Sequence, residues 1–258
     1  PHDDAVVRGG STTSLLFQFT TALRPRIRPG DEIIVTETDH ESNVGHWKRL
    51  AEAGAVLKTW RVNRETFELD LADLEAMLTP RTQWVAMTQA SNVLGTINDV
   101  RKVSSVVHAA GARLAVDAVA FAPHRLPDVA ASGADLYVFS FYKVFGPHYA
   151  VMAIDRDLLL SLPSINHFFI AADDLPYKLQ PGNVNFELSY GAAGIPEYLD
   201  GVAAHHGLDG SVRERRHAAY GLFAAQEDAL SIRLLDYLRG KRGVRIIGRD
   251  RVTNGDRV

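Results

Sequence analysis

Short apolar runs alternate with helical patterns between residues 11 and 155, and this alternation limits the possible folds more than any other feature. Runs typical of buried strands lie at residues 31–36, 55–60, 83–88, 113–116, 135–139 and 149–154. The helical patterns between them include residues 11–23 and 99–110. Strands that alternate with helices over short connections favour a mostly parallel sheet with helices on both faces. We therefore predict an α/β fold.

Four polar side chains follow the last apolar residues of four different strands. They are His40, Asn92, Asp117 and Lys143. Each alone has an ordinary structural explanation, such as helix capping or a polar loop. In open parallel sheets, however, ligands bind beyond the carboxyl ends of the strands. The shared placement therefore predicts that the four side chains converge on one edge of the sheet.

Lys143 follows the strongly apolar run at residues 136–139 and precedes a Gly-Pro turn. Taken alone, it reads more readily as a surface lysine in a loop. Lysine is rarely fully buried without a partner or a function. At the end of a buried strand, loss of hydration would favour the neutral amine that a Schiff-base lysine needs. Burial of Lys143 at the sheet edge is therefore an expectation from the sequence.

The helix that begins near residue 11 has an unusual start. Two glycines, at positions 9 and 10, precede four hydroxyl residues, Ser11 to Ser14. Such residues cap a helix, and free N–H groups at a helix start also bind phosphate. The two readings stay equally open here. A nucleotide-binding α/β protein is a weak alternative, because both the Walker and the dinucleotide fingerprints are missing.

Composition excludes several classes of site. The 258 residues contain no cysteine, which excludes disulfides, thiolate metal sites and a cysteine nucleophile among them. The net charge is -3 and the arginines are scattered, so no nucleic-acid partner is expected. No run approaches the ~18 apolar residues of a membrane span, and no signal peptide is evident, so we expect a cytoplasmic location and no membrane contact. His205 and His206 point in different directions on a helix, and no metal site is predicted.

A lysine, a carboxylate and a phosphate-binding helix start are the parts of a pyridoxal phosphate site. The lysine would form the Schiff base with the cofactor. A carboxylate, here Asp117, must face the pyridine nitrogen to keep it protonated. An aromatic ring should stack on the cofactor, and an amide can contact its ring hydroxyl. The polar residues at the strand ends include each of these groups.

Four segments resemble the large domain of fold-type I pyridoxal phosphate enzymes, in the class V aminotransferase superfamily. They are residues 36–43, 91–96, 116–124 and 140–147. The third and fourth are most similar to the cysteine desulfurase-like branch. The resemblance implies a PLP-dependent transferase-like large domain at residues 1–206, without its N-terminal extension, built on a mostly parallel, seven-stranded type of sheet between helices. Residues 207–258 would hold a long linking helix and the start of an incomplete small domain.

The resemblance also implies a role for each matching residue. Lys143 would form the Schiff base and move the proton at the substrate Cα, and Asp117 would pair with the pyridine nitrogen. His40 would stack on the ring and help with proton transfer, so these three are the expected catalytic residues. The residues expected to bind the cofactor are Thr12, Thr13, His40, Asn92, Asp117, Ser140, Tyr142, Lys143 and Asn183. Relatives often have a histidine at the position of Tyr142 and a threonine that reaches the partner subunit's phosphate at that of Asn183. Ala120 stands where relatives carry Gln or His.

We predict an enzyme that acts on a small amino-acid substrate through Lys143, most similar to a cysteine desulfurase, which cleaves a C–S bond and transfers sulfur. Alternatives are an aminotransferase, a selenocysteine or C–S lyase or an amino-acid epimerase of the same superfamily, and a non-catalytic homologue. The family's nucleophilic cysteine and carboxylate-binding arginine belong to a C-terminal domain that the sequence lacks. A homodimer with sites completed across the interface is expected. Both ends of the chain look truncated, and the C-terminal end comes just after an apparent strand at residues 244–247.

Overall fold

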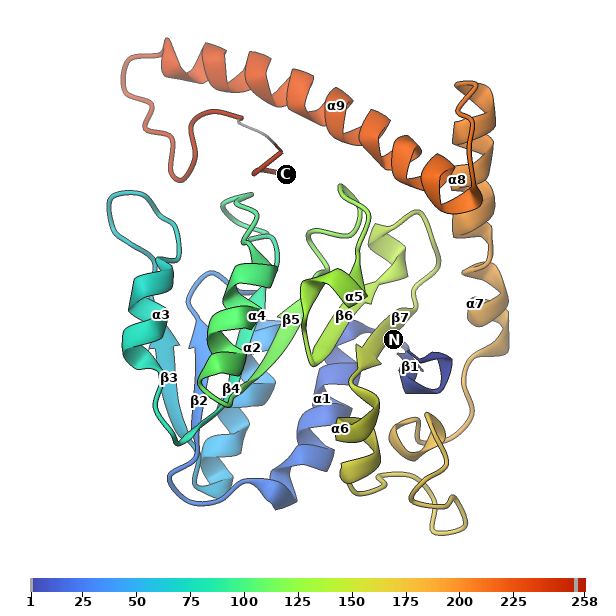
Figure 1. Cartoon of the computed structure of the whole chain (residues 1–258). Helices are drawn as coiled ribbons and strands as arrows, with labels where there is room; N and C mark the ends of the chain where they lie inside the picture. The colour runs from blue at the N-terminus through green and yellow to red at the C-terminus, as the bar shows by residue number, and fades with distance from the viewer. Residues whose placement is uncertain (1, 253–254) are drawn as a thin grey trace.

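A single seven-stranded sheet forms the centre of the protein (Figure 1). The computed structural model describes residues 2–252 and 255–258. The strands are β1 (Val6–Gly9), β2 (Glu32–Thr36), β3 (Val56–Trp60), β4 (Thr82–Thr88), β5 (Arg113–Asp117), β6 (Leu136–Ser140) and β7 (Ala150–Ile154), in the order β1-β7-β6-β5-β4-β2-β3. Neighbours from β3 to β6 are parallel, whereas β7 is antiparallel to both β6 and β1. The prediction of a mostly parallel sheet is confirmed.

Helices cover both faces of the sheet. One face carries α1 (Thr12–Leu23), α2 (Glu41–Lys48) and α6 (Arg156–Ser161), and the other carries α3 (Leu71–Met77), α4 (Val100–Ala109) and α5 (Val129–Ser132). On the first face the ring of Trp84 lies 5.2 Å from that of Trp47 and 5.4 Å from that of Phe19. Because both faces are covered, the central strands are almost continuously apolar, as in other doubly covered parallel sheets.

The helix boundaries follow from local side-chain chemistry. Ser11 caps α1 by accepting the Ser14 N–H, and the Ser14 hydroxyl accepts the Ser11 N–H in return. Asp99 caps α4 through the Lys102 N–H. Gly111 ends that helix region with a φ of +76°, a conformation that glycine adopts without a steric cost. These caps explain why the predicted helices at residues 11–23 and 99–110 begin and end where they do.

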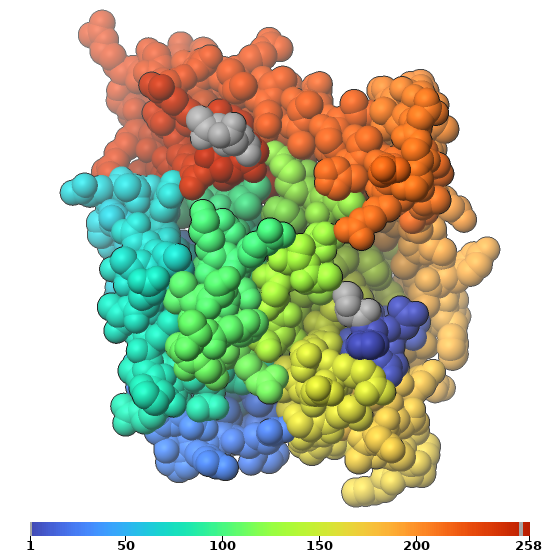
Figure 2. Space-filling model, in the orientation of Figure 1, coloured from blue at the N-terminus to red at the C-terminus, as the bar shows by residue number. Residues whose placement is uncertain are grey.

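The C-terminal part lies across the carboxyl edge of the sheet. It contains α7 (Phe186–Gly191), α8 (Gly194–His205) and the long α9 (Val212–Arg239). A small apolar cluster joins α8 and α9 to the body, with Ile195 and Tyr220 packed near Val144. Beyond α9 the chain returns to the body, where the Val258 N–H donates to the Gly95 carbonyl over 2.8 Å. Figure 2 shows this segment lying on the upper edge of the molecule.

Short 3-10 turns complete the structure: η1 (Asp3–Ala5), η2 (Arg24–Arg26), η3 (Arg49–Ala53), η4 (Phe141–Lys143) and η5 (Tyr177–Leu179). No helix in the described part of the chain is long and apolar enough to cross a membrane.

Two strand assignments differ from the expectations. The strand β1 was not predicted, because its four residues, Val-Val-Arg-Gly, are too few to show an apolar pattern. The prediction of a strand at residues 244–247 is wrong, because this segment has an irregular backbone. Its apolar residues lie after α9, where no neighbouring strand among the described residues pairs with them. A strand needs such a partner for its backbone hydrogen bonds.

Candidate cofactor site at the carboxyl ends of the strands

A pocket opens where β4, β5 and β6 end and α1 and α2 begin. Its lining residues are Thr12, Thr13, His40, Ser42, Thr88, Asn92, Asp117, Val119, Ala120, Tyr142 and Lys143. Seven of the nine residues expected to bind the cofactor therefore line one pocket. Ser140 lies directly behind it, and Asn183 lies elsewhere. The parallel strands account for this convergence, since each delivers its last residues to the same edge.

The start of α1 forms one end of the pocket. The Thr12 N–H donates to the Ser140 hydroxyl over 3.3 Å, and the hydroxyl groups of these two residues are 2.7 Å apart. This contact fixes the first turn of α1 against the end of β6. The first N–H groups of a helix lack intrahelical acceptors, and they lie at the positive end of the helix dipole. Thr12 and Thr13 add hydroxyl donors at that end, so it suits an anion such as a phosphate.

Asp117 lies at the inner end of the pocket and is 4% exposed. The only hydrogen bond to its carboxylate among the described residues comes from the Val119 N–H, 2.8 Å from Oδ1. Burial raises the pKa of Asp117 to about 6, although this hydrogen bond and the charges of His40 and Lys143 lower it. A buried carboxylate with so few donors is suited to receive a cationic N–H from a ligand.

A second carboxylate, Asp39, lies close to Asp117 and was not among the predicted site residues. Its Oδ1 accepts the Thr88 N–H over 2.7 Å, and its Oδ2 accepts the Asn43 side-chain amide over 2.8 Å. Burial and the negative charge of Asp117 raise the pKa of Asp39 to about 7, against the hydrogen bonds that it accepts. Its place directly before His40 at a strand end was the available signal.

His40 is both the cap of α2 and a wall of the pocket. Its Nδ1 accepts the Ser42 N–H over 3.1 Å and lies 2.8 Å from the Ser42 hydroxyl. The two contacts orient the imidazole ring at the pocket edge. Ser42 and Thr88 also line the pocket and were not predicted. Thr88 is the last residue of β4 and pairs in register with Asp117, so its position in the strand could have identified it.

Lys143 lies at the pocket but is exposed, so the expectation of a buried lysine is wrong. The reason is local. The strand β6 ends at Ser140, and the 3-10 turn η4 then carries Lys143 away from the sheet interior. The neighbouring Tyr142 is 41% exposed, and its ring stacks on that of His148 at 4.9 Å. The side chains of Lys143 and Tyr142 are therefore both accessible to a ligand in the pocket.

Asn183 lies in a separate hollow with His167, Phe169, Ile170 and Tyr177. Phe169 in that hollow is 82% exposed. Among the described residues, no contact brings Asn183 to the pocket at the strand ends. A role for Asn183 toward the phosphate of a second subunit stays a prediction.

The donor set of the pocket fits pyridoxal phosphate. The start of α1 offers donors to a phosphate, the amine of Lys143 can condense with an aldehyde, and the poorly solvated carboxylate of Asp117 can accept a ring N–H. These groups come from α1, η4 and β5, and they line one continuous space.

Several known proteins are similar to this chain in sequence. Residues 2–167 match the sequence model of the family described as Aminotransferase class-V. The chain is 36% identical over 258 residues to the aminotransferase-like protein FGM3 of Gibberella zeae, covering 99% of this chain and 60% of that protein. It is 34% identical over 264 residues to the cysteine desulfurase-like protein ustD of Aspergillus flavus, covering 99% of this chain and 57% of that protein.

Among solved structures, the cysteine desulfurase CsdA of Escherichia coli, in its S-sulfonic acid form, superposes with a TM-score of 0.81. The two sequences are 27% identical, and the match covers 97% of this chain and 62% of the other. The chain thus spans about three fifths of the length of these relatives.

Proposed function

The chain belongs to the class V aminotransferase family, and on that premise we propose that it is part of a pyridoxal-phosphate-dependent enzyme that acts on an amino acid. One observation carries the proposal: Asp117, Lys143 and the start of α1 line a single pocket. A structural role alone gives no reason for a buried carboxylate with one described hydrogen bond to lie beside a lysine and a helix start.

The residues would hold the cofactor at three points. Thr12, Thr13 and the first N–H groups of α1 would bind its phosphate, with Ser140 fixing Thr12. Asp117 would accept the ring N–H. Asn92 and Tyr142, which also line the pocket, would contact the ring substituents and the phosphate. Ala120 offers no polar group, so a contact that Gln or His makes in relatives would be missing here.

When bound, pyridoxal phosphate supplies an electron-accepting ring that stabilises negative charge at the substrate Cα. Lys143 would bind the cofactor covalently through Nζ and, once displaced by the substrate amine, would hold or return the proton at Cα. Asp117 would keep the ring nitrogen protonated through its negative charge. His40, oriented by Ser42, would cover one side of the ring and exclude water from it.

For the reaction we propose cysteine desulfurase-like cleavage of a C–S bond. The support is the similarity to proteins named cysteine desulfurase, including that of Dickeya dadantii, which is 31% identical over 225 residues. The second candidate is transamination or lyase chemistry. It is favoured because the 258 residues contain no cysteine, so an acceptor thiol would have to lie outside them.

The domain limits at residue 206, the homodimer, the amino-acid substrate and the cytoplasmic location belong to the same proposal. The domain limits, the homodimer and the amino-acid substrate follow from the family resemblance rather than from a contact in the single chain, and the cytoplasmic location is the default expectation from the sequence.

The proposal is tested by adding pyridoxal phosphate to the full-length protein. We expect a visible absorbance band that borohydride abolishes, because it reduces the imine to a stable secondary amine, with mass spectrometry locating the added mass on Lys143. Lys143→Ala should abolish the band and the adduct, while Lys102→Ala, an exposed lysine of α4, should leave both unchanged. Absence of the band in the unmodified protein would favour a non-catalytic homologue.

A second measurement separates the candidate reactions. The loaded protein is incubated with L-cysteine and dithiothreitol, which reduces a persulfide to sulfide, and separately with L-alanine and 2-oxoglutarate as amino-group acceptor. Sulfide together with alanine from cysteine supports desulfuration, sulfide together with pyruvate from cysteine supports lyase chemistry, and pyruvate from alanine supports transamination.

A further inference from the structure

A second hollow lies at the opposite edge of the sheet, where the parallel strands begin. Its lining residues are Leu23, Pro25, Arg26, Ile27, Arg28, Asp31, Gln83, Trp84, Gly111, Arg113 and Leu158. Its volume is about 450 Å³, within the range of small-molecule pockets. It shares no lining residue with the candidate cofactor site. The proposed function therefore leaves this pocket unexplained.

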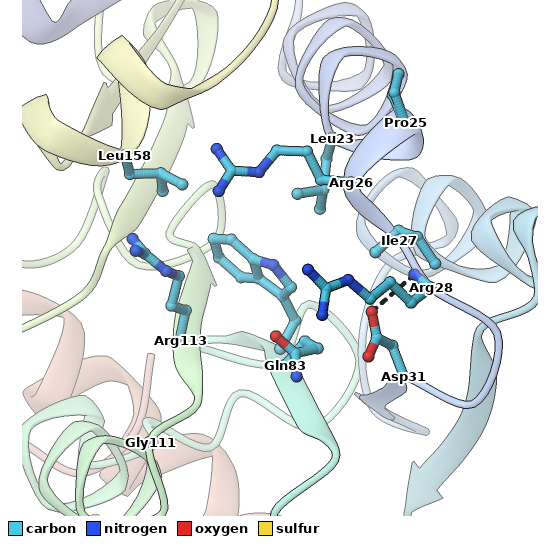
Figure 3. A pocket seen from close by; sticks show the side chains of 11 residues that line it. Leu23, Pro25, Arg26, Ile27, Arg28, Asp31, Gln83, Gly111, Arg113 and Leu158 are labelled. Carbon is cyan, nitrogen blue, oxygen red and sulfur yellow. Dashed lines mark hydrogen bonds between the residues drawn. The ribbon is translucent and has the colours of Figure 1, made fainter.

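Three arginines from different segments meet in the pocket. Arg26 ends η2, Arg28 lies in the loop before β2, and Arg113 is the first residue of β5. Figure 3 shows their guanidinium groups on different sides of the pocket, with an aromatic ring drawn between them. The chain as a whole carries a net charge of -3, so this local excess of positive charge runs against the average.

Two carboxylates near the pocket offset part of this charge and leave an excess of positive charge. Asp31 is the only acidic residue in the lining, and its Oδ2 accepts the backbone N–H of Arg28 over 2.8 Å. The Oδ1 of Asp135 lies 3.8 Å from Arg113, and Oδ2 of the same carboxylate is occupied by His108 at 2.9 Å and by the Leu114 N–H.

The remaining contacts leave guanidinium donors free for a ligand. One Nη of Arg26 donates to the Ser161 carbonyl over 2.7 Å, which positions the side chain at the edge of the pocket. The Arg28 guanidinium makes no hydrogen bond or ion pair within the described residues, and Figure 3 shows it beside Gln83. Like charges brought together repel one another where carboxylates offset only part of the charge, so such a cluster favours an anion between them.

We propose that this pocket binds a small organic anion that carries two or more adjacent phosphate charges. Arginine forks bind phosphate oxygens in pairs, and three of them match a diphosphate better than a single carboxylate. The apolar wall of Leu23, Ile27 and Leu158 leaves room for an attached organic group. The place of the pocket at the far edge of the sheet makes it a second site, separate from the phosphate end of the cofactor.

The test is calorimetric titration of the full-length protein with inorganic pyrophosphate and, separately, with ATP. Excess pyridoxal phosphate is present, so that the start of α1 is already occupied. We expect one binding site, with an affinity that falls as salt rises. Arg28→Ala should weaken binding by about tenfold or more, because a charge-assisted contact is lost. The affinity of Arg28→Lys should lie between those of Arg28→Ala and the unmodified protein, since lysine keeps the positive charge and loses the paired N–H donors of the guanidinium group.

Arg213→Ala is the matched control, because Arg213 is an exposed arginine on α9 that pairs with Asp128. It should leave the affinity unchanged. Stronger binding of ATP than of pyrophosphate would identify the ligand as a nucleotide rather than a free diphosphate. The proposal is overturned if neither probe binds, if Arg28→Ala and Arg113→Ala bind as tightly as the unmodified protein, or if Arg213→Ala has the same effect as they do. A protein that fails to bind pyridoxal phosphate can still be titrated, so the two proposals are tested separately.

Discussion

Asp117 is the residue on which the proposed cofactor binding depends most directly. Its buried carboxylate accepts one described hydrogen bond, from the Val119 N–H. Asp117→Asn keeps the shape of the side chain but removes the charge that would hold the ring N–H. We expect the affinity for pyridoxal phosphate to fall about 10- to 100-fold, as for loss of a charged hydrogen bond. Equilibrium dialysis measures this affinity, and an unchanged affinity would show that Asp117 does not contact the cofactor.

Asp39 should give the protein without cofactor a specific pH dependence. Burial and Asp117 raise the pKa of Asp39 from 3.8 to about 7 in the folded protein. Between these values the folded protein binds more protons than the unfolded chain, so stability falls as the pH rises from about 4 to about 7. Asp117, whose pKa is raised to about 6, acts in the same direction.

Asp39→Asn should remove part of this slope, because the amide stays neutral at every pH. The variant also loses one hydrogen bond, since its amide group cannot accept from Asn43. We therefore expect it to be less stable than the unmodified protein at pH 4.5 and to recover relative to it by pH 8, in urea unfolding experiments. The exposed Asp209→Asn is the control. Parallel stability curves for Asp39→Asn and the unmodified protein would contradict the prediction.

At the residue scale, sequence analysis located the pocket but not the state of each side chain. His40, Asn92, Asp117 and Lys143 were placed together because parallel strands end at one edge, and the structure brings them to one pocket. The exposure of Lys143 depends on the turn η4, and the coupling of Asp39 to Asp117 depends on the distance between the loop after β2 and the end of β5. Neither property is encoded in the residues next to it in the chain.

At the scale of elements, Glu32 joins three strands at their amino ends. It lies at the start of β2, is 1% exposed and accepts hydrogen bonds from Lys58 on β3 at 2.6 Å and Thr82 on β4 at 3.1 Å. Thr79 and Arg81 also donate to it. Burial raises its pKa, but these four donors outweigh burial and hold the pKa of Glu32 at about 2.

Glu32→Gln should therefore destabilise the sheet by about 2–4 kcal/mol at pH 7, because Lys58 loses a buried partner. The folded pKa lies below the unfolded value of 4.5, so this stabilisation is present above pH 4.5 and is lost as the pH falls toward 2. Chemical denaturation at pH 7 and pH 3 measures both effects. Glu52→Gln breaks an exposed pair with Arg24 and should cost less than about 1 kcal/mol. Equal losses in the two variants would refute the proposed role of Glu32.

The elements that sequence analysis predicted correctly are those with a strong local pattern. The parallel strands β2, β4, β5 and β6 are mostly buried and have nearly continuous apolar runs, whereas β3 lies at the sheet edge and is more exposed. The helices α1 and α4 have capping residues at their starts. The edge strand β1 has only four residues, and the apolar run at residues 244–247 has no strand beside it. Whether each of these two segments forms a strand depends on its pairing with a distant segment, and no local sequence pattern predicts such pairing.

At the scale of the whole molecule, the exposed aromatic surface bears on the predicted homodimer. Phe168 and Phe169 are 110% and 82% exposed, and Tyr190 is 86% exposed. Phe169 lies in the same hollow as Asn183, the residue expected to reach the cofactor phosphate of a second subunit. Large exposed apolar side chains of this kind mark an interaction site in many proteins. The aromatic residues would then be the contact that brings Asn183 to its partner.

The double variant Phe168→Ser, Phe169→Ser should convert a dimer into a monomer, because it removes apolar area without disturbing the core. Light scattering after size-exclusion chromatography measures the mass of the full-length protein. Phe17→Ser, which changes a half-exposed phenylalanine on α1, is the comparison. It should lower the fraction of dimer less than the double variant does, unless α1 belongs to the same interface. If the monomeric double variant also binds pyridoxal phosphate more weakly, and Asn183→Ala weakens binding while remaining dimeric, Asn183 acts across the interface. A monomeric unmodified protein would contradict the dimer, and Asn183 would then have no route to the pocket.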